Sequence, residues 1–273
     1  MSPEPEAYID DSRRLTDDDT FVFACHPGCE CFTRCCHDLS LVLMPYDILR
    51  LKRRLGLSSG EFLRRYTSVH VGQGSGLPVV TLKMEGADLR CPFLDPGSGC
   101  TVYEDRPSAC RTYPLARMAR RSKEMEGVEE FYFVVREPDC LGFREDRRWS
   151  VREWKENEGL GPYNAMNDAF GELLQAKTEV GVGAMDADQI EIFYLGCYDV
   201  DGFRASYLEG PSLDRYLEPP EVLEEIARDE EALLRHGMRW VKKKLFQGGC
   251  AACGAACGRG APDDPDGVTP PGR

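Results

Sequence analysis

Cysteine is the residue type in this 273-residue chain with the clearest capacity for chemistry. Thirteen cysteines are present, and five of them fall within residues 25–36, in the stretch FACHPGCECFTRCC. Thiolates are soft ligands that suit zinc, iron–sulfur clusters and copper(I), and close spacing lets one loop present several sulfurs to one centre. This density favours metal binding over scattered buried thiols. Disulfides are the alternative, although an odd number cannot pair completely within the chain.

The adjacent pair Cys35-Cys36 is the most specific part of this pattern. Side chains of consecutive residues usually diverge, so two such sulfurs fit poorly in one compact tetrahedral site. They fit better when they bind different metal atoms, or when one binds and the other has another role. The pair therefore favours a polynuclear centre over a single zinc ion.

The segments FACHPGCECFTRCC, CPFLD and CTVYEDRPSACRTYP, with a later cysteine, resemble the YkgJ-type cysteine cluster family, whose pattern is called a zinc- or iron-chelating CxxCxxCC domain. The resemblance covers residues 21–145. The first half of the pattern is spaced more widely here, so either Cys29 or Cys31 takes the second position, and Cys31 is favoured. The resemblance implies eight metal-binding cysteines: Cys25, Cys31, Cys35, Cys36, Cys91, Cys100, Cys110 and Cys140.

The resemblance also implies a bound metal, with an iron–sulfur cluster favoured over zinc. A related cysteine cluster in flagellin lysine N-methylases is associated with an iron–sulfur cluster, although no methylase-specific feature is recognised in residues 146–246. We therefore expect a metal-binding protein. Two alternatives remain: an iron–sulfur-dependent enzyme acting on a protein partner, and a metal chaperone that uses the C-terminal Cys250, Cys253 and Cys257.

Other side chains beside the cysteines are candidates for supporting roles. Arg106 and Arg111 flank Cys110 and could offset the negative charge of a thiolate-bound centre or donate hydrogen bonds to sulfur. The alternative is a surface ion pair between Asp105 and Arg106, with Pro107 starting a short helix. His26 and His37 also lie beside cysteines, but we expect them to be neighbours of the site more often than ligands. Cys197 is expected to be a buried thiol within a helix.

The charge balance restricts the partners of the chain. The formal net charge is −13, which argues against nucleic-acid binding. No run of about 18 apolar residues predicts a membrane span, and the acidic N-terminus does not resemble a secretory signal. A reducing, cytoplasmic location is therefore expected. It would keep the thiols free for a metal ion, and a protein partner remains a second option.

The pattern of apolar and helix-capping residues predicts an α+β fold: a small loop-rich cysteine-cluster domain with short helices and a few strands, then a mainly helical portion. Helices are expected at 45–56 and after Ser58, with strands near 79–84 and 129–137. Further helices are expected after Ser150, over 162–180 and 221–246, and in 186–208 with a break near 199–202. The predicted organisation is an acidic disordered tail (1–20), the cysteine-cluster domain (21–145), a helical portion packed on it (146–246) and a flexible tail (247–273).

Overall fold

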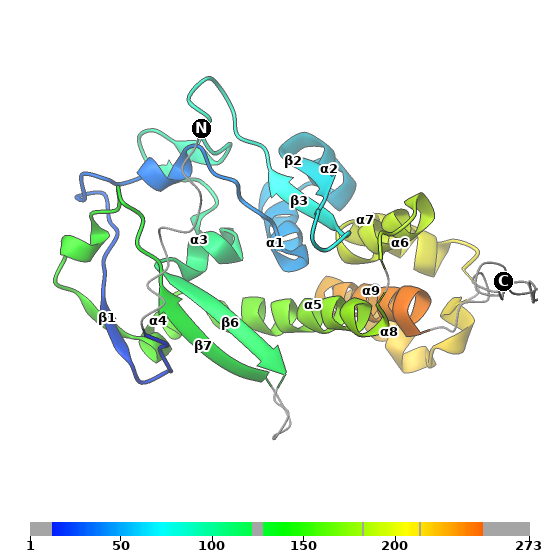
Figure 1. The fold of residues 1–273 in the computed structure, drawn as a ribbon. Helices are drawn as coiled ribbons and strands as arrows, with labels where there is room; N and C mark the ends of the chain where they lie inside the picture. Colours follow the sequence, from blue (N-terminus) through cyan, green and yellow to red (C-terminus); the bar gives the residue numbers. More distant parts are fainter. Residues whose placement is uncertain (1–12, 122–127, 182, 213, 248–273) are drawn as a thin grey trace, which may run out of the picture.

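A computed structural model describes residues 13–121, 128–181, 183–212 and 214–247 (Figure 1). It confirms the α+β class, with short strands in small sheets and a helical C-terminal portion. Cysteines 250, 253 and 257 and residues 1–12 lie outside the described residues. Among the described residues, no helix is both apolar enough and long enough to cross a membrane.

The strands form four antiparallel pairs, and each pair is a separate two-stranded sheet. The expected strand at 129–137 and the one near 79–84 are present, and the latter is half of a hairpin whose first strand the sequence did not predict. The pairs are β1 (Thr20–Val22) with β8 (Arg148–Ser150), β2 (Thr67–Val71) with β3 (Pro78–Leu82), β4 (Leu94–Asp95) with β5 (Gly99–Cys100), and β6 (Leu115–Arg121) with β7 (Val128–Val134).

Two helices, α2 and α4, begin at capping residues that the sequence singled out. Ser58 accepts a hydrogen bond from the backbone N–H of Glu61 at 3.2 Å, and Ser150 forms a reciprocal capping box with Glu153. The nine α-helices of the described part are α1 (Pro45–Leu55), α2 (Ser59–Tyr66), α3 (Ser108–Thr112), α4 (Val151–Asn157), α5 (Leu160–Val180), α6 (Ala187–Cys197), α7 (Val200–Arg204), α8 (Pro220–Arg228) and α9 (Glu230–Lys242).

One predicted helix is divided in two. The segment 221–246 forms α8 and α9, with a break at Asp229. Asp229 has an extended backbone and its carboxylate accepts a hydrogen bond from the N–H of Glu231 at 2.8 Å, so it caps the start of α9. The break between α6 and α7 lies at Tyr198–Asp199, close to the predicted position.

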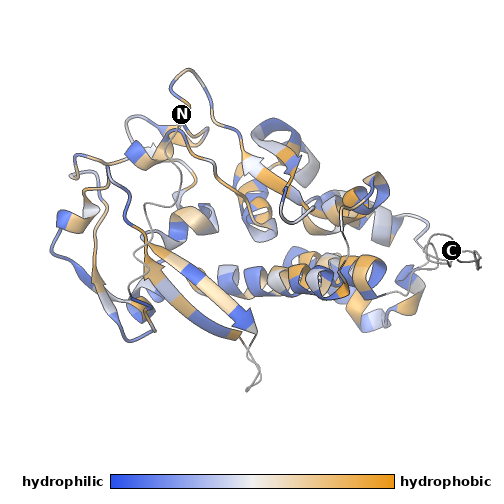
Figure 2. Cartoon of the chain, in the orientation of Figure 1, coloured by the Kyte–Doolittle hydropathy of each residue, from blue (hydrophilic) through white to orange (hydrophobic). Residues whose placement is uncertain are grey.

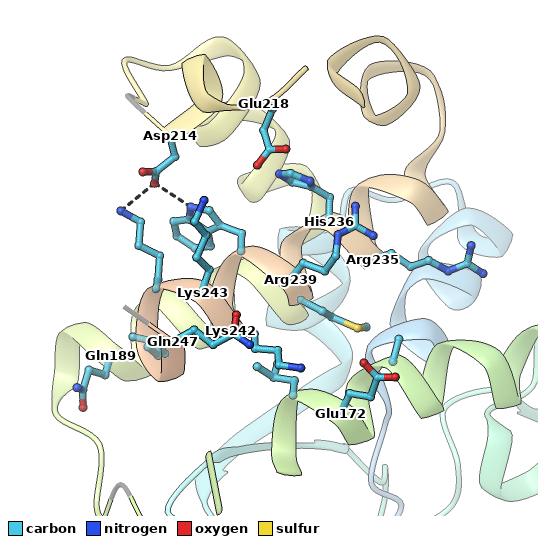
Figure 3. A pocket seen from close by; sticks show the side chains of 16 residues that line it. Glu172, Gln189, Asp214, Glu218, Arg235, His236, Arg239, Lys242, Lys243 and Gln247 are labelled. Carbon is cyan, nitrogen blue, oxygen red and sulfur yellow. Dashed lines mark hydrogen bonds and ion pairs between the residues drawn. The ribbon is translucent and has the colours of Figure 1, made fainter. Parts of the chain in front are cut away.

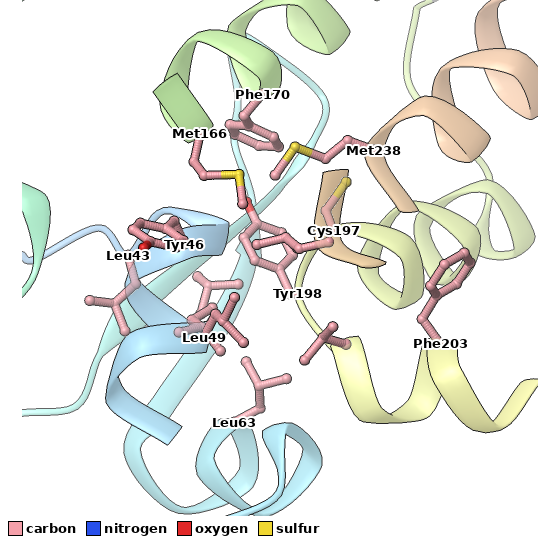
Figure 4. Packing of buried hydrophobic residues seen from close by; sticks show 14 of the residues in the cluster. Leu43, Tyr46, Leu49, Leu63, Met166, Phe170, Cys197, Tyr198, Phe203 and Met238 are labelled. Carbon is pink, nitrogen blue, oxygen red and sulfur yellow. The ribbon is translucent and has the colours of Figure 1, made fainter. Parts of the chain in front are cut away.

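Two hydrophobic clusters hold these elements together. The larger runs from α1 and α2 through α5, α6 and α9, so it is built from both halves of the chain; Figure 4 shows part of it around Tyr198. At its centre α6 and α9 cross so closely that a Cβ on Gly237 would lie 2.2 Å from the carbonyl oxygen of Gly196. The smaller cluster joins β1, β6, β7, β8 and α4. In Figure 2 the orange faces of the helices turn toward one another.

Residues 13–20, assigned from the sequence to the acidic tail, lie against the smaller cluster. Leu15 is buried and its backbone pairs with Tyr132 of β7. Asp17 accepts a hydrogen bond from Lys155 of α4 at 2.9 Å. The placed N-terminal segment therefore closes one end of the smaller cluster.

Candidate metal centre

The first cysteine-rich loop lies beside the second one, although about fifty residues separate them in the sequence (Figure 1). The N–H of Cys91 donates to the carbonyl of Cys36 at 2.7 Å, and the N–H of Asp38 donates to the carbonyl of Leu89 at 2.8 Å. These backbone bonds bring the Cys35-Cys36 pair next to the CPFLD segment. We refer to the two loops, residues 23–40 and 86–112, together with residues 137–145, as the cysteine layer.

Cys100 and Cys110 reach the layer from two short elements. Cys100 ends the β4–β5 hairpin, and Cys110 lies on α3, which starts after Pro107 as predicted. The first turn of α3 is fixed to α1 by Asp47, whose carboxylate accepts the N–H of Ser108 at 2.8 Å and its hydroxyl at 3.0 Å. The larger hydrophobic cluster therefore holds α3, and with it Cys110, through a buried carboxylate.

Cys35 is close to cysteines from all the other segments of the layer. A charged group changes the pKa of a neighbour only at short range. Burial is the largest cause of the raised thiol pKa at five positions, and the charge of Cys35 adds to it at each: Cys25, Cys91, Cys100, Cys110 and Cys140. Cys31 acts in the same way on Cys25 and Cys140. These effects place the eight predicted cysteines in one region. Among the described residues, however, no three of them have sulfur atoms that all lie within 4.8 Å of one another.

The adjacent pair is coupled directly. Cys36 donates a hydrogen bond to Cys35, which lowers the pKa of the Cys35 thiol to about 7 and raises that of Cys36. By contrast, the sulfurs' surroundings raise the pKa of Cys25 and of Cys110 to about 12, although both residues are exposed as a whole. None of the ten described cysteines forms a disulfide. Thiols that repel one another when ionised are the kind of environment that a bound cation stabilises.

Cys29 and Cys31 are both buried, but they face different partners. The Sγ of Cys31 accepts a hydrogen bond from the N–H of Leu141 at 3.1 Å, directly beside Cys140. The Sγ of Cys29 instead faces the carbonyl of Ala24 and the carboxylate of Glu145, each at 3.9 Å. N–H groups that point at a sulfur are typical of the surroundings of metal-bound thiolates. The orientation of Cys31 thus agrees with its assignment to the predicted set.

Cys29 belongs to a second group at the edge of the layer. Ligand atoms of His26, Cys29 and Glu145 all lie within 4.8 Å of one another. The Nδ1 of His26 accepts the N–H of Gly28 at 3.1 Å, so the ring proton lies on Nε2, which faces Glu145 at 3.3 Å. A metal ion at Nε2 would have to displace that proton. The three side chains therefore form a hydrogen-bonded group that closes residues 25–31 onto 140–145.

Arg106 and Arg111 lie behind the thiols and are held by a carboxylate and by carbonyl groups. Arg106 pairs with Glu158 and stacks over Tyr103, with its Cζ 3.9 Å from the ring centroid. Its charge counteracts the rise in the pKa of Cys100. Arg111 donates to the carbonyls of Glu158 and Glu104. Asp105 pairs with Arg50 at 2.6 Å, so the alternative of an Asp105–Arg106 pair is wrong.

Sequence reasoning did not identify several residues that support the layer. Asp47 lies in α1, Glu158 directly follows α4, and Glu145 lies beside Cys29. Tyr113, which lies beside Cys140, was expected from the sequence as part of a hydrophobic shell around the centre. Among the other candidates, His37 pairs with Asp88 at 3.7 Å, and Cys197 is fully buried in α6 as expected.

Backbone strain is concentrated in the cysteine layer. Three residues other than glycine adopt a positive φ in the described part of the chain: Thr33, Asp38 and Leu89. All three lie in the two cysteine-rich loops. Such conformations are unfavourable for residues with a side chain, and persist only where their surroundings hold them.

Comparison with protein families agrees with this geometry. Residues 24–141 match the model of the CxxCxxCC family, described as a putative zinc- or iron-chelating domain. This segment, which covers the cysteine layer from Ala24 to Leu141, is therefore similar to the CxxCxxCC family. No curated protein and no solved structure matches the chain.

Proposed function

We propose that this protein binds an iron–sulfur cluster through the cysteine layer, in a reducing compartment such as the cytoplasm. The ligands are drawn from eight cysteines: Cys25, Cys31, Cys35, Cys36, Cys91, Cys100, Cys110 and Cys140. The observation that supports this most is the position of Cys35, which lies within electrostatic reach of cysteines from every other segment of the layer. Bound in this position, an iron–sulfur cluster would supply electron-transfer chemistry.

The number and type of donors favour a centre with more than one metal atom. A structural zinc ion takes four ligands, whereas the proposed set has eight thiols. Four thiolates would already give one Zn²⁺ a local charge of about −2. Cys35 and Cys36 are adjacent and coupled, so they fit two neighbouring metal atoms better than one. Arg106 provides a positive charge beside Cys100 and Cys110 that offsets part of the anionic centre.

The test is anaerobic purification of the full chain, followed by iron, zinc and acid-labile sulfide analysis and an optical spectrum. We expect two or more irons per chain with matching sulfide, and broad absorption that bleaches on reduction. One zinc and no iron would contradict the iron–sulfur assignment but retain metal binding. A metal-free protein with oxidised cysteines would contradict both.

The C-terminal cysteines offer a control for this measurement. A variant in which Cys250, Cys253 and Cys257 are all changed to serine keeps every cysteine of the layer. We expect it to hold the same amount of metal per chain as the unchanged protein. Loss of most of the metal would assign the binding to the tail and contradict the proposal.

A further inference from the structure

A cavity of about 960 Å³ lies on the helical side of the molecule, away from the cysteine layer. Figure 3 shows the cavity between three parts of the chain: α5, α9 and the segment that precedes α8. Part of its wall is apolar and comes from Leu173 of α5 with Met238 and Trp240 of α9. Leu245, in the π-helical turn that follows α9, extends this wall. The apolar wall could receive a hydrocarbon or aromatic group.

The rest of the wall is basic, although the chain as a whole carries a net charge of −13. Five basic side chains line the cavity against three acidic ones. Asp214 is already bound by Lys244 and by the indole N–H of Trp240, both at 2.9 Å. Glu172 and Glu218 are the other two acids. Four cations make no ion pair with another described residue: Arg235, Arg239, Lys242 and Lys243.

A buried histidine supplies the second observation. His236 is 3% exposed and lines the cavity, and neither of its ring nitrogens has a hydrogen-bond partner among the described residues. The hydroxyl of Tyr207, whose ring centroid lies 4.9 Å from that of His236, also lacks a partner there. Burial is the main cause that lowers the pKa of His236, and the charges of Arg239 and Lys243 lower it further. The charge of Glu218 acts in the opposite direction. Buried polar groups normally find partners, so each one without a partner needs an explanation.

We propose that this cavity binds a small organic anion. Its carboxylate or phosphate head would bind between Arg239, Lys242 and Lys243, and its apolar body would lie against Leu173, Met238 and Trp240. A polar group of the ligand, reached by a small shift of the ring, would supply the partner that His236 lacks. The proposal concerns a different region from the cysteine layer and does not depend on the bound metal.

The probes for the test are decanoate and decyl phosphate, with decyltrimethylammonium as the matched cation. Titration calorimetry on the full chain measures the affinity, and quenching of Trp240 fluorescence locates the site, since Trp149 and Trp154 lie in the smaller cluster. We expect one anion per chain, with a preference between the two anions that identifies the head group. Equal binding of the cation, or no binding of either anion, would overturn the proposal.

Two variants make the test specific. Arg239→Gln with Lys242→Gln removes two exposed or half-buried charges, and we expect about tenfold weaker anion binding. Arg228→Gln on α8 is the control, because Arg228 is exposed and does not line the cavity; its affinity should be unchanged. His236→Phe removes the unpartnered nitrogens, so it should weaken anion binding without lowering thermal stability. Unaltered affinity in both cavity variants would contradict the proposal.

Discussion

The helical core and the cysteine layer are held together in different ways. In the core, Ile48, Phe193 and Leu233 are fully buried within the larger hydrophobic cluster. In residues 24–40 of the layer, only Cys29 and Cys31 are buried. Burial of apolar surface is the main source of folding free energy, and a loop with so little of it needs another source. We therefore propose that the core folds by packing, whereas residues 24–40 of the layer would depend on a bound metal.

The strained backbone sharpens this contrast. The positive φ angles of Thr33, Asp38 and Leu89 all lie in the layer, and each costs roughly 1–2 kcal/mol. Metal binding can supply far more than this, on the order of 10 kcal/mol for small zinc domains. A bound metal would therefore be sufficient to hold the loops in the observed shape.

Removal of the metal should have the largest effect of all these changes. It should destabilise the cysteine layer and leave the helical core unchanged. After treatment with a strong chelator under reducing conditions, we expect hydrogen exchange to accelerate at the amides of Cys36, Cys91 and Leu141. The amide of Leu233 in α9 should keep its protection, because it bonds within a packed helix. Equal loss of protection in both regions would show that the core also depends on the metal.

The matched pair Cys31→Ser and Cys29→Ser tests the assignment of ligands within the layer. Both cysteines are buried to a similar extent, so the cost of a new hydroxyl group should be similar. We expect Cys31→Ser to lose most of the bound metal, because its sulfur faces the other ligands. Cys29→Ser should keep it. The reverse result, measured as metal per folded chain, would exchange the roles of the two residues.

Truncation of a core side chain should lower the stability of the fold but leave metal binding unchanged. Phe193→Ala removes a fully buried ring that contacts Phe170 and Tyr198, and such changes typically lower the free energy of unfolding by about 3–5 kcal/mol. We expect this loss in chemical denaturation, with no change in the metal content of the folded fraction. A variant that folds normally but loses metal would mean that the two regions are not independent.

A buried ion pair gives the core its expected dependence on pH. Lys52 is buried and bound by Asp201 and Glu230. Burial raises the pKa of both carboxyl groups, but the backbone N–H of Ser59 and then Lys52 lower that of Asp201, and Lys52 with Arg53 lowers that of Glu230, so both pKa values end below their usual range. A lowered folded-state pKa stabilises the protein above the unfolded value of about 4, and this stability is lost as the pH falls through the folded-state pKa.

Lys52→Met should remove about 3 kcal/mol of this stability at pH 7. The variant should also lose less stability than the unchanged protein between pH 5 and 3, because Lys52 no longer lowers the two pKa values. Thermal unfolding across this pH range measures both effects. A pH dependence as steep as that of the unchanged protein would show that Lys52 does not cause the shifts.

The sequence predicted local features well because they depend on neighbours in the chain. Pro45 and Gly56 mark the ends of α1, and Ser150 starts α4. The sequence did not indicate that Asp47 fixes α3, that Glu158 binds Arg106, or that His236 is buried without a partner. These contacts arise from packing between distant segments, and no local pattern encodes them.

X-ray absorption at the metal edge of the anaerobically purified full chain tests the central claim most directly. We predict that the metal has sulfur neighbours at about 2.3 Å, together with a second metal atom nearby, and that Cys31→Ser weakens this signal whereas Cys29→Ser does not. A metal surrounded by oxygen and nitrogen alone would contradict the account.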